Sequence, residues 1–400
     1  MKYVVLIGDG MADYPLQELN NQTPLQVSHK PHMDEVAHQG INGLIKTIPP
    51  GMPPGSDVAN LSIMGYNPQK YYTGRGPLEA ASMGVNIGNK IAFRCNLITE
   101  NKGILEDFNA GHISSLEAEI LIKTLNQELN IGTFYSGISY RHLFLYDENI
   151  SGSFKTTPPH DIVGSPIKDY LIPEDNPQAH TLNNLVMDSK KVLQNHPVNE
   201  ERIKQGKKPA NMIWLWGQGG KPHMESFQDK YGLKGSTITG VDLIKGLGVY
   251  LGLNNINVPG ATGYYDTDYK AKGEYGVEAL KDHDLLFIHV EAPDEAGHAG
   301  DITEKIKAIE QIDAKILGPL LDNLPSYEDF ALALLPDHAT PIPIKTHTMD
   351  PIPCAIYSSL NKGDGVSKYD EFSAKSGSLQ LDYAYQLIHK LMSFFVRSRL

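Results

Sequence analysis

Short apolar runs alternate with segments of helical periodicity over much of this 400-residue chain. Residues 3–7, 285–290 and 331–335 are the clearest runs, and their near-continuous apolar character is typical of strands buried on both faces. Strands that alternate with helices favour a mainly parallel sheet covered by helices, so the sequence predicts an α/β fold. The other expected segments are strands at 43–48 and 211–216 and helices at 31–39, 241–251 and 303–317.

Acidic and imidazole side chains follow three of these strands at the point where each apolar run ends. They are Asp9, Asp294, His298, Asp337 and His338, with His347 in a loop further on. Ligands of open α/β sheets bind beyond the carboxyl ends of the strands, so we expect these groups to meet at one edge. A lone Asp-His pair is most often a turn, but the coincidence at several strand ends predicts a site for two divalent metal ions.

Ser56 follows a loop, residues 49–55, that is too rich in Pro and Gly for a regular element. The residues after Ser56 have helical spacing up to Gly65, so the serine is expected at a helix N-terminus, where an anion is favoured. Two metal ions suit in-line displacement at phosphorus, and metal coordination can activate a serine. Serine is also a common N-cap residue, and the two roles are compatible.

The middle of the chain differs from both ends. A helix is expected at 116–129, a strand at 138–146, and the loops between them are polar. A charged stretch at 196–209 has the composition of a linker. We therefore predict a discontinuous α/β domain formed by residues 1–86 and 209–400, with a smaller α+β domain, residues 87–208, inserted between them.

Charge and cysteine content narrow the class of protein. The net charge of −12 argues against nucleic acid or an anionic membrane as the main partner. No apolar run approaches the roughly 20 residues that span a bilayer, and the N-terminus lacks a signal-peptide pattern. Cys95 and Cys354 lie far apart in sequence, which is typical of a cytoplasmic protein without a disulfide scaffold. The sequence does not give the oligomeric state.

Several short stretches resemble the alkaline phosphatase superfamily and, more closely, the archaeal-type cofactor-independent phosphoglycerate mutases. The likeness is carried, in order along the chain, by residues 8–10, 54–60, 72–80, 93–97, 158–161, 214–219, 292–301 and 336–338, together with His347. The combination covers essentially the whole chain and is highly specific, although no single stretch is.

The resemblance implies two metal sites around a serine nucleophile. One site would contain Asp294, His298 and His347, and the other Asp9, Ser56, Asp337 and His338. The implied cofactors are two divalent ions, Mn first with Mg, Zn or Co as alternatives, and no 2,3-bisphosphoglycerate. The implied reaction moves the phosphoryl group of phosphoglycerate onto Ser56 and back to the other hydroxyl, while the inserted domain excludes water as a lid.

The inserted domain is also expected to hold the carboxylate of this small phosphorylated substrate, a task suited to arginine. The substrate-contact candidates are Arg94, Arg141, His160, Asp161, Asn96 and Lys221. An arginine in a strand is more commonly part of a surface ion pair, so the assignment rests on the resemblance.

Three other functions share the expected metal core or fold. A clade that resembles this mutase type has been proposed to act as a homoserine kinase, but the chain has no Gly-x-x-x-x-Gly-Lys-Ser/Thr loop to cradle a nucleotide. A phosphomonoesterase would result if water reached the phosphoserine. A non-catalytic metal-binding protein would have no need of Ser56.

Overall fold

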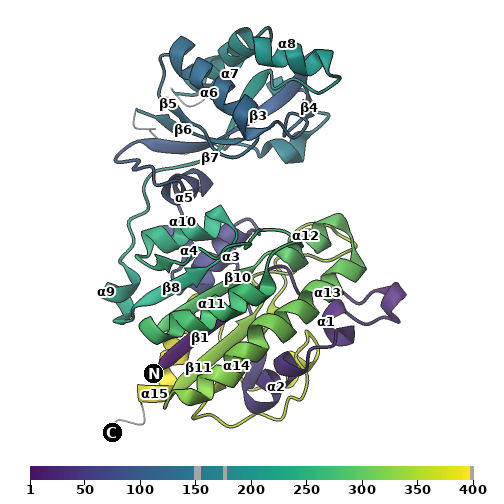
Figure 1. Ribbon diagram of the computed structural model, residues 1–400, viewed down its shortest axis with the longest axis vertical. Helices are drawn as coiled ribbons and strands as arrows, with labels where there is room; N and C mark the ends of the chain where they lie inside the picture. Colours follow the sequence, from purple (N-terminus) through teal and green to yellow (C-terminus); the bar gives the residue numbers. More distant parts are fainter. Residues whose placement is uncertain (148–154, 174–177, 397–400) are drawn as a thin grey trace. The chain divides into compact units, whose positions relative to one another are not determined.

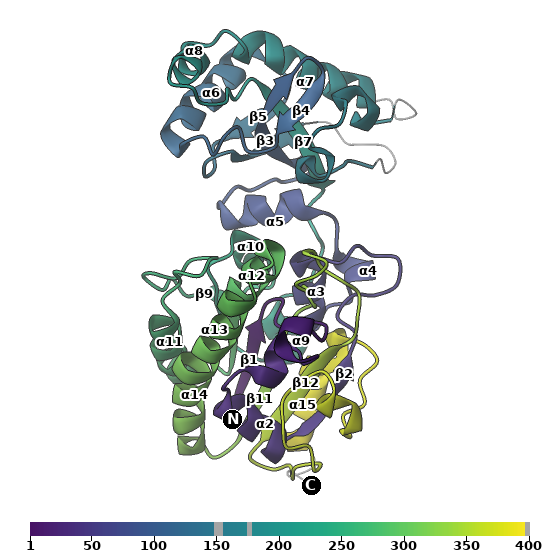
Figure 2. The ribbon, with the colours of Figure 1, turned by 90° about the vertical axis from the view of Figure 1, so that its right-hand side faces the viewer.

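The chain forms two compact units. The computed structural model describes residues 1–147, 155–173 and 178–396. The first unit combines Met1–Tyr72 with Met224–Leu400, and the second unit is the continuous segment Thr73–His223. The boundaries that the sequence placed after residues 86 and 208 fall inside the second unit. Figures 1 and 2 show the two units in two orientations.

A seven-stranded sheet forms the centre of the first unit, in the order β2-β12-β11-β1-β10-β8-β9. The strands are β1 (Lys2–Gly8), β2 (Ile41–Ile45), β8 (Gly235–Ile238), β9 (Asn254–Asn255), β10 (Leu285–Val290), β11 (Phe330–Leu335) and β12 (Ile352–Ser358). From β11 to β9 neighbouring strands are parallel, whereas β12 runs antiparallel to both β11 and β2. The predicted α/β class with a mainly parallel sheet is confirmed.

Helices cover this sheet. They are α1 (Pro24–Val27), α2 (Pro31–Gln39), α3 (Ser56–Ile63), α4 (Pro68–Tyr71), α9 (Phe227–Tyr231), α10 (Asp242–Tyr250), α11 (Tyr269–Asp282), α12 (Ala292–Ala299), α13 (Ile302–Ile312), α14 (Gly318–Asn323) and α15 (Leu387–Val396). Figure 1 shows α11, α13 and α14 in front of the sheet, and Val4 and Leu6 share a core cluster with residues of these helices. Tyr3 packs instead on Phe395 of α15, so successive residues of β1 bury opposite faces of the sheet.

The second unit contains an antiparallel sheet in the order β4-β3-β6-β5, and β7 also pairs with β3. Its strands are β3 (Ile91–Asn101), β4 (Ile104–Asp107), β5 (Thr133–Tyr135), β6 (Arg141–Tyr146) and β7 (Met212–Gly219), and its helices are α5 (Arg75–Ser82), α6 (Ser115–Glu128), α7 (Ala179–Leu193) and α8 (Pro197–Lys204). Among the described residues of either unit, no helix is long and apolar enough to cross a membrane.

The strand expected at 211–216 was assigned to the wrong sheet. We expected it in the parallel sheet, but β7 pairs antiparallel with β3. Its apolar run is buried, as a strand of either sheet would be, so the sequence contained no signal for its partner.

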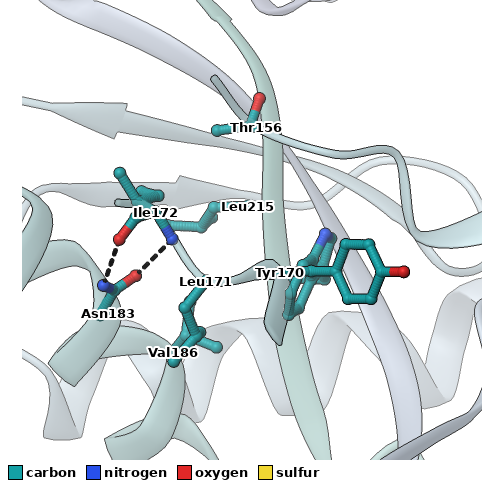
Figure 3. A pocket seen from close by; sticks show the side chains of 8 residues that line it. Thr156, Tyr170, Leu171, Ile172, Asn183, Val186 and Leu215 are labelled. Atoms are coloured by element: carbon teal, nitrogen blue, oxygen red, sulfur yellow. Dashed lines mark hydrogen bonds between the residues drawn. The ribbon is translucent and has the colours of Figure 1, made fainter. Parts of the chain in front are cut away.

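A small pocket lies between the segment before α7 and strand β7 of the second unit (Figure 3). Asn183 of α7 closes one side of it. The backbone N–H of Ile172 donates to the Asn183 side-chain oxygen at 3.0 Å, and the Asn183 amide donates to the Ile172 carbonyl at 2.9 Å. These two bonds fix the loop around Ile172 on α7, within the core that supports β7.

His142 in β6 gives the second unit a pH-dependent stability. Burial lowers the pKa of His142 from 6.5 to about 3, and its Nδ1 accepts a hydrogen bond from the Gly137 N–H at 3.0 Å. Above pH 6.5 the imidazole is neutral in both states. As the pH falls from 6.5 towards 3, the unfolded chain takes up a proton that the folded chain does not, so stability is lost at about 1.4 kcal/mol per pH unit.

His142→Gln should remove this contribution. We expect the difference in unfolding free energy between the wild type and the variant to shrink by about 2 kcal/mol between pH 6.5 and pH 5, measured by urea denaturation of both proteins. Comparing the two proteins cancels the titration of the groups they share. His180→Gln, at an exposed position of α7, is the matched control. A difference for His142→Gln that does not change with pH would contradict the assignment.

Candidate active site

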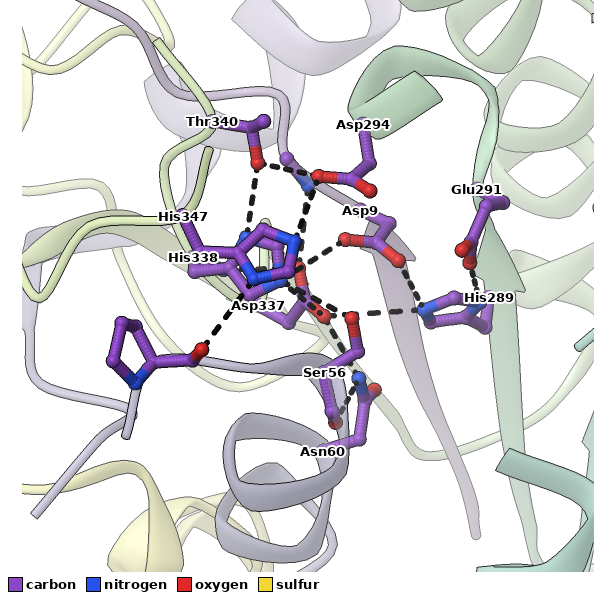
Figure 4. Close-up of polar contacts among 12 residues, drawn as sticks. Asp9, Ser56, Asn60, His289, Glu291, Asp294, Asp337, His338, Thr340 and His347 are labelled. Carbon is purple, nitrogen blue, oxygen red and sulfur yellow. Dashed lines mark hydrogen bonds and ion pairs between the residues drawn. The ribbon is translucent and has the colours of Figure 1, made fainter. Parts of the chain in front are cut away.

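The central three strands of the first unit deliver the predicted side chains to one edge of the sheet. β1 lies between β10 and β11 and is parallel to both, with Gly8 opposite Val290 and Ile7 opposite Leu335. All three strands therefore end at the same level. Asp9 follows β1, Asp337 follows β11, and α12 begins directly after β10. Figure 4 shows their side chains gathered at this edge.

One cluster consists of Asp294, His298 and His347. Asp294 and His298 are four residues apart in α12, and His298 Nε2 lies 3.2 Å from Asp294 Oδ2. His347 Nε2 lies 3.6 Å from Asp294 Oδ1 and 3.0 Å from His298 Nε2. The Nδ1 atom of His298 contacts the Lys345 carbonyl at 2.9 Å, which leaves Nε2 for the cluster.

A second cluster is formed by Asp9, Asp337, His338 and Ser56. His338 Nε2 is 3.5 Å from Asp9 Oδ1, 3.6 Å from Asp337 Oδ2 and 3.2 Å from Ser56 Oγ. Asp9, Asp337 and His338 are completely buried, whereas Ser56 is partly exposed. The serine is therefore the member of this cluster that an incoming ligand can reach.

Ser56 is the first residue of α3, as its sequence context predicted. Asn60 follows one turn later, and its amide donates to the Ser56 carbonyl at 2.9 Å and to Asp337 Oδ2 at 2.8 Å. This bridge fixes the start of α3 against the loop after β11. Sequence reasoning missed Asn60, although its position four residues after Ser56 places both on one face of the helix.

Charge at this edge is unbalanced. Burial raises the pKa of Asp9 well above its ordinary value, and the nearby Asp337, Glu291 and Asp294 raise it further. Burial also opposes ionisation of Asp294, but hydrogen bonds from His298 and His347 outweigh it and lower the pKa of Asp294. Several carboxylates thus lie close together in a buried region, which favours the binding of a cation there.

The donor set fits divalent metal ions. Both carboxylate oxygens of Asp9 are buried, and neither accepts a well-aligned hydrogen bond from the described part of the chain. The ligand atoms of Asp294, His298 and His347 lie within 4.8 Å of one another, as do those of Asp9, Asp294 and His338. Carboxylate oxygen and imidazole nitrogen are common ligands of such ions, so both groups are compatible with metal binding.

His289 also points at Asp9, and sequence reasoning missed it as a site residue. Its Nε2 lies 3.1 Å from Asp9 Oδ2, and its Nδ1 lies 3.8 Å from Glu291 Oε2. The buried Lys272 donates to the His289 carbonyl at 3.3 Å. His289 is the only polar residue of β10, and its place within an apolar strand hid it.

Lys305 of α13 ties the loop after β1 to the loop after β11. Its ammonium group donates to Asp13 Oδ2 at 2.6 Å, to the Thr340 carbonyl at 2.9 Å and to the Ala12 carbonyl at 3.3 Å. Lys305 and Asp13 are both buried, and removing one partner of such a pair costs about 3–5 kcal/mol. The loops that carry Asp9 and His338 are therefore strongly held together.

In the second unit, three predicted substrate-contact residues gather around Trp216. The Arg94 guanidinium lies 4.7 Å from the Trp216 ring centre, and the His160 ring lies 5.6 Å from it. Asn96 Oδ1 accepts a hydrogen bond from the indole N–H at 3.0 Å, while the Asn96 amide donates to the Phe108 carbonyl. Asn96 thereby holds Trp216 in place.

A carboxylate with several arginines lies beside this tryptophan. Arg94 contacts Glu79 Oε1 at 2.9 Å, and Arg75 contacts the same oxygen at 3.4 Å. Burial alone would raise the pKa of Glu79, but Arg94, Arg75 and Arg141 together lower it. Arg75 and Glu79 were not among the predicted site residues, although they lie within the stretch 72–80 that carries the family likeness.

The other three predicted substrate-contact residues are exposed. Asp161 is exposed and lies 3.8 Å from His160. Arg141, at the start of β6, is exposed and lies 6.0 Å from the ring centre of Tyr140. Lys221 is exposed in the segment after β7. A role of these residues in substrate binding stays a prediction.

Comparison with known proteins identifies relatives along the whole chain. A family model described as 2,3-bisphosphoglycerate-independent phosphoglycerate mutase matches residues 37–199. The 2,3-bisphosphoglycerate-independent phosphoglycerate mutase 2 from Methanothermobacter thermautotrophicus is 56% identical over 100% of this chain and 99% of its own length. The phosphoglycerate mutase of the same description from Methanosarcina acetivorans is 53% identical over 98% of this chain and 100% of its own.

Solved structures show the same architecture. A protein from Pyrococcus horikoshii is 31% identical, with a TM-score of 0.84 over 99% of this chain and 97% of its own. The cofactor-independent phosphoglycerate mutase from Thermoplasma acidophilum is 29% identical, with a TM-score of 0.68 over 98% of this chain and 99% of its own.

The fold, together with a carboxylate–imidazole cluster beside a helix-terminal serine, defines an α/β protein of the cofactor-independent phosphoglycerate mutase type, with groups suited to divalent ions. The chain belongs to the family of 2,3-bisphosphoglycerate-independent phosphoglycerate mutases, which are isomerases. The family predicted from the sequence is thereby confirmed.

Proposed function

We propose that this protein interconverts 3-phosphoglycerate and 2-phosphoglycerate through a phosphoserine at Ser56, as a step of glycolysis and gluconeogenesis. One observation carries the proposal. The chain belongs to a mutase family, and Ser56 is the first residue of helix α3. Its Oγ lies 3.2 Å from His338 Nε2, beside a cluster of buried carboxylates. The cytoplasmic location stays a prediction from the sequence, and this observation does not bear on the oligomeric state.

Two divalent ions are part of the proposal, with Mn preferred and Mg, Zn or Co as alternatives. Asp294, His298 and His347 would hold one ion. Asp9, Ser56, Asp337 and His338 would hold the other, because the first three of these place an oxygen atom within 3.6 Å of His338 Nε2. When bound, such ions neutralise phosphoryl oxygens and activate the serine hydroxyl. No 2,3-bisphosphoglycerate is required, because the phosphoryl group is stored on the protein.

The reaction balances in two half-steps. In the first, a bond forms between Ser56 Oγ and phosphorus while the phosphorus–oxygen bond to glycerate breaks, and the hydroxyl proton of Ser56 is matched by the proton gained by the departing glycerate oxygen. In the second, a bond forms between the other hydroxyl oxygen of glycerate and phosphorus while the bond between Ser56 Oγ and phosphorus breaks, and the proton released by that hydroxyl is matched by the proton that Ser56 Oγ regains. The N–H groups at the start of α3 favour the anionic phosphoryl group in both steps.

The substrate carboxylate needs a cationic partner, and we assign it to the second unit. Arg94, Arg75 and Arg141 act together on the single carboxylate of Glu79, so positive charge is in excess there. Burial lowers the pKa of Arg94 to about 10, and the guanidinium still carries its charge at neutral pH. Arginine binds carboxylates through two parallel hydrogen bonds, which suits this role. In this proposal the second unit acts as a lid that retains glycerate between the two half-steps.

A paired assay tests the proposal against its nearest alternatives. The purified protein loaded with Mn is given 3-phosphoglycerate alone, and separately homoserine with ATP. We expect 2-phosphoglycerate to form and no homoserine phosphate. Measuring free phosphate in the first reaction detects a phosphomonoesterase, because water entering the site would hydrolyse the phosphoserine. Homoserine phosphorylation without mutase turnover would overturn the proposal.

A further inference from the structure

The second unit contains a cleft that is separate from the residues around Trp216. The cleft has a volume of about 460 Å³ and is lined by residues of the β3–β4 turn, the segment 166–171, helix α7 and the start of β7. Glu100, on its wall, lies six residues beyond Arg94 in β3. At about 3.3 Å per residue, the two positions are about 20 Å apart. The cleft therefore lies outside the proposed substrate site.

Most of the cleft lining is apolar. Met187 of α7 is 45% exposed, and Leu171 also lines the small pocket of Figure 3. Methionine side chains are flexible and adapt to apolar ligands of irregular shape. Clefts of this volume with a mainly apolar lining are typical of small-molecule sites. The apolar side chains of the lining are Ile104, Pro166, Ile167, Leu171, Met187 and Met212.

The polar part of the lining is cationic. Lys102, Lys168 and Lys190 line the cleft, and Glu100 is the only acid among the described residues that does so. Lys190 Nζ lies 2.5 Å from Glu100 Oε2, so these two charges offset each other. Lys102 and Lys168 form no ion pair with any described residue. In a chain with a net charge of −12, this local excess of positive charge attracts an anion to the cleft.

Lys102 adopts a strained backbone conformation at the edge of the cleft. A two-residue turn joins β3 to β4, and both of its residues have positive φ, +50° at Lys102 and +85° at Gly103. Such turns favour Asn, Asp or Gly at the first position, because other L-residues are strained in the left-handed region. A strained residue beside a cleft indicates a function other than stability.

The backbone beside the lysines indicates which kind of anion fits. The N–H of Gly103 donates to Glu100 Oε1, and the N–H of Leu105 donates to the Ser165 carbonyl at 3.0 Å. The N–H of Ile167 donates to the Gly103 carbonyl at 2.9 Å. Phosphate sites commonly use several backbone N–H groups that have no other partner. Because these three are engaged, the lysine ammonium groups must hold the anion, which suits a singly charged carboxylate.

We propose that this cleft is a second ligand site, which binds an aliphatic carboxylate. The aliphatic chain lies against the isoleucine and methionine side chains, and the carboxylate lies at Lys102 and Lys168. The proposal does not depend on the mutase function, because none of the residues assigned to catalysis or substrate binding lines the cleft.

Decanoate is the probe for this site. It is titrated into the full-length protein carrying carbon-13 in its methionine methyl groups, and the spectra are followed by NMR. We expect the Met187 and Met212 signals to shift with a single dissociation constant, while Met349, exposed in the first unit, stays unchanged. Shorter carboxylates should bind about 4-fold more weakly for each CH₂ removed. Unchanged Met187 and Met212 signals at saturating decanoate would overturn the proposal.

Lys102→Asn and Lys168→Gln test the contact with the carboxylate. Each should weaken decanoate binding about 5-fold, the upper range for one exposed ion pair. Lys123→Gln makes the same change of charge at an exposed position of α6 and should leave binding unchanged. Decanoate binding unaffected in both cleft variants would overturn the proposal, and so would tighter binding of decyl phosphate than of decanoate.

Lys102→Asn has a second expected effect. Its midpoint in urea denaturation should rise, because asparagine tolerates the left-handed conformation of the turn better than lysine. A more stable protein that binds decanoate more weakly would separate the role of Lys102 in binding from any role in folding. A midpoint that falls instead would show that Lys102 supports the turn itself and would overturn its assignment to the ligand.

Discussion

Ser56→Ala is expected to reduce mutase turnover by about 10⁴-fold or more while the protein still binds metal ions. The alanine lacks the hydroxyl oxygen to which the proposed mechanism transfers the phosphoryl group. The carboxylates and imidazoles around it remain in place, because Asn60 bonds to the backbone carbonyl of residue 56 and not to its side chain. Turnover is measured with 3-phosphoglycerate, and metal content by elemental analysis of the same sample.

Ser62→Ala is the matched control for this substitution. Ser62 lies in the same helix, is completely buried, and takes no part in the cluster around His338. We expect turnover within a few-fold of the wild type, because the change leaves Ser56 and its neighbours untouched. Substantial turnover by Ser56→Ala, with phosphoryl label found on another residue, would show that the nucleophile is elsewhere.

Asp294→Asn is expected to remove about 4 kcal/mol of transition-state stabilisation, equivalent to about 10³-fold in kcat/KM. Asp294 contacts His298, His347 and Thr340, so the loss of its charge affects three partners at once. An amide is nearly the same size but cannot supply the negative charge that a divalent ion requires. The bound Mn should fall from two ions to one.

Asp322→Asn provides the same chemical change at an exposed position in α14. We expect both turnover and Mn content to match the wild type. Equilibrium dialysis counts the bound ions without depending on catalysis, so it distinguishes a missing ion from a misplaced one. Two tightly bound ions in Asp294→Asn would exclude this carboxylate as a ligand.

The strand ends could be predicted because their signal is local. Asp9 and Asp337 each follow an apolar run, and parallel strands bring such ends together whatever the order of the strands. Ser56 was placed at a helix start by the Pro- and Gly-rich loop before it and by the apolar spacing after it. These inferences needed no knowledge of which residues pack against which.

Residues that act through a neighbour were the ones that sequence reasoning missed. Thr340 matters because its hydroxyl lies between Asp294 and His338, a relation that exists only after three segments have folded together. His289 was hidden in the same way inside an apolar strand. The partner of β7 could not be predicted either, because burial alone does not specify which sheet a strand joins.

The central position of β1 has a consequence for the order in which the protein can assemble during synthesis. Both neighbours of β1 in the sheet, β10 and β11, come from the last third of the chain, whereas the second unit is continuous and has its own apolar core. The second unit can therefore fold on the ribosome before β10 and β11, the strands that pair with β1, have been synthesised. A chain that stops before His347 contains Ser56 without the full set of charged neighbours, so an incomplete product is not expected to be an uncontrolled phosphatase.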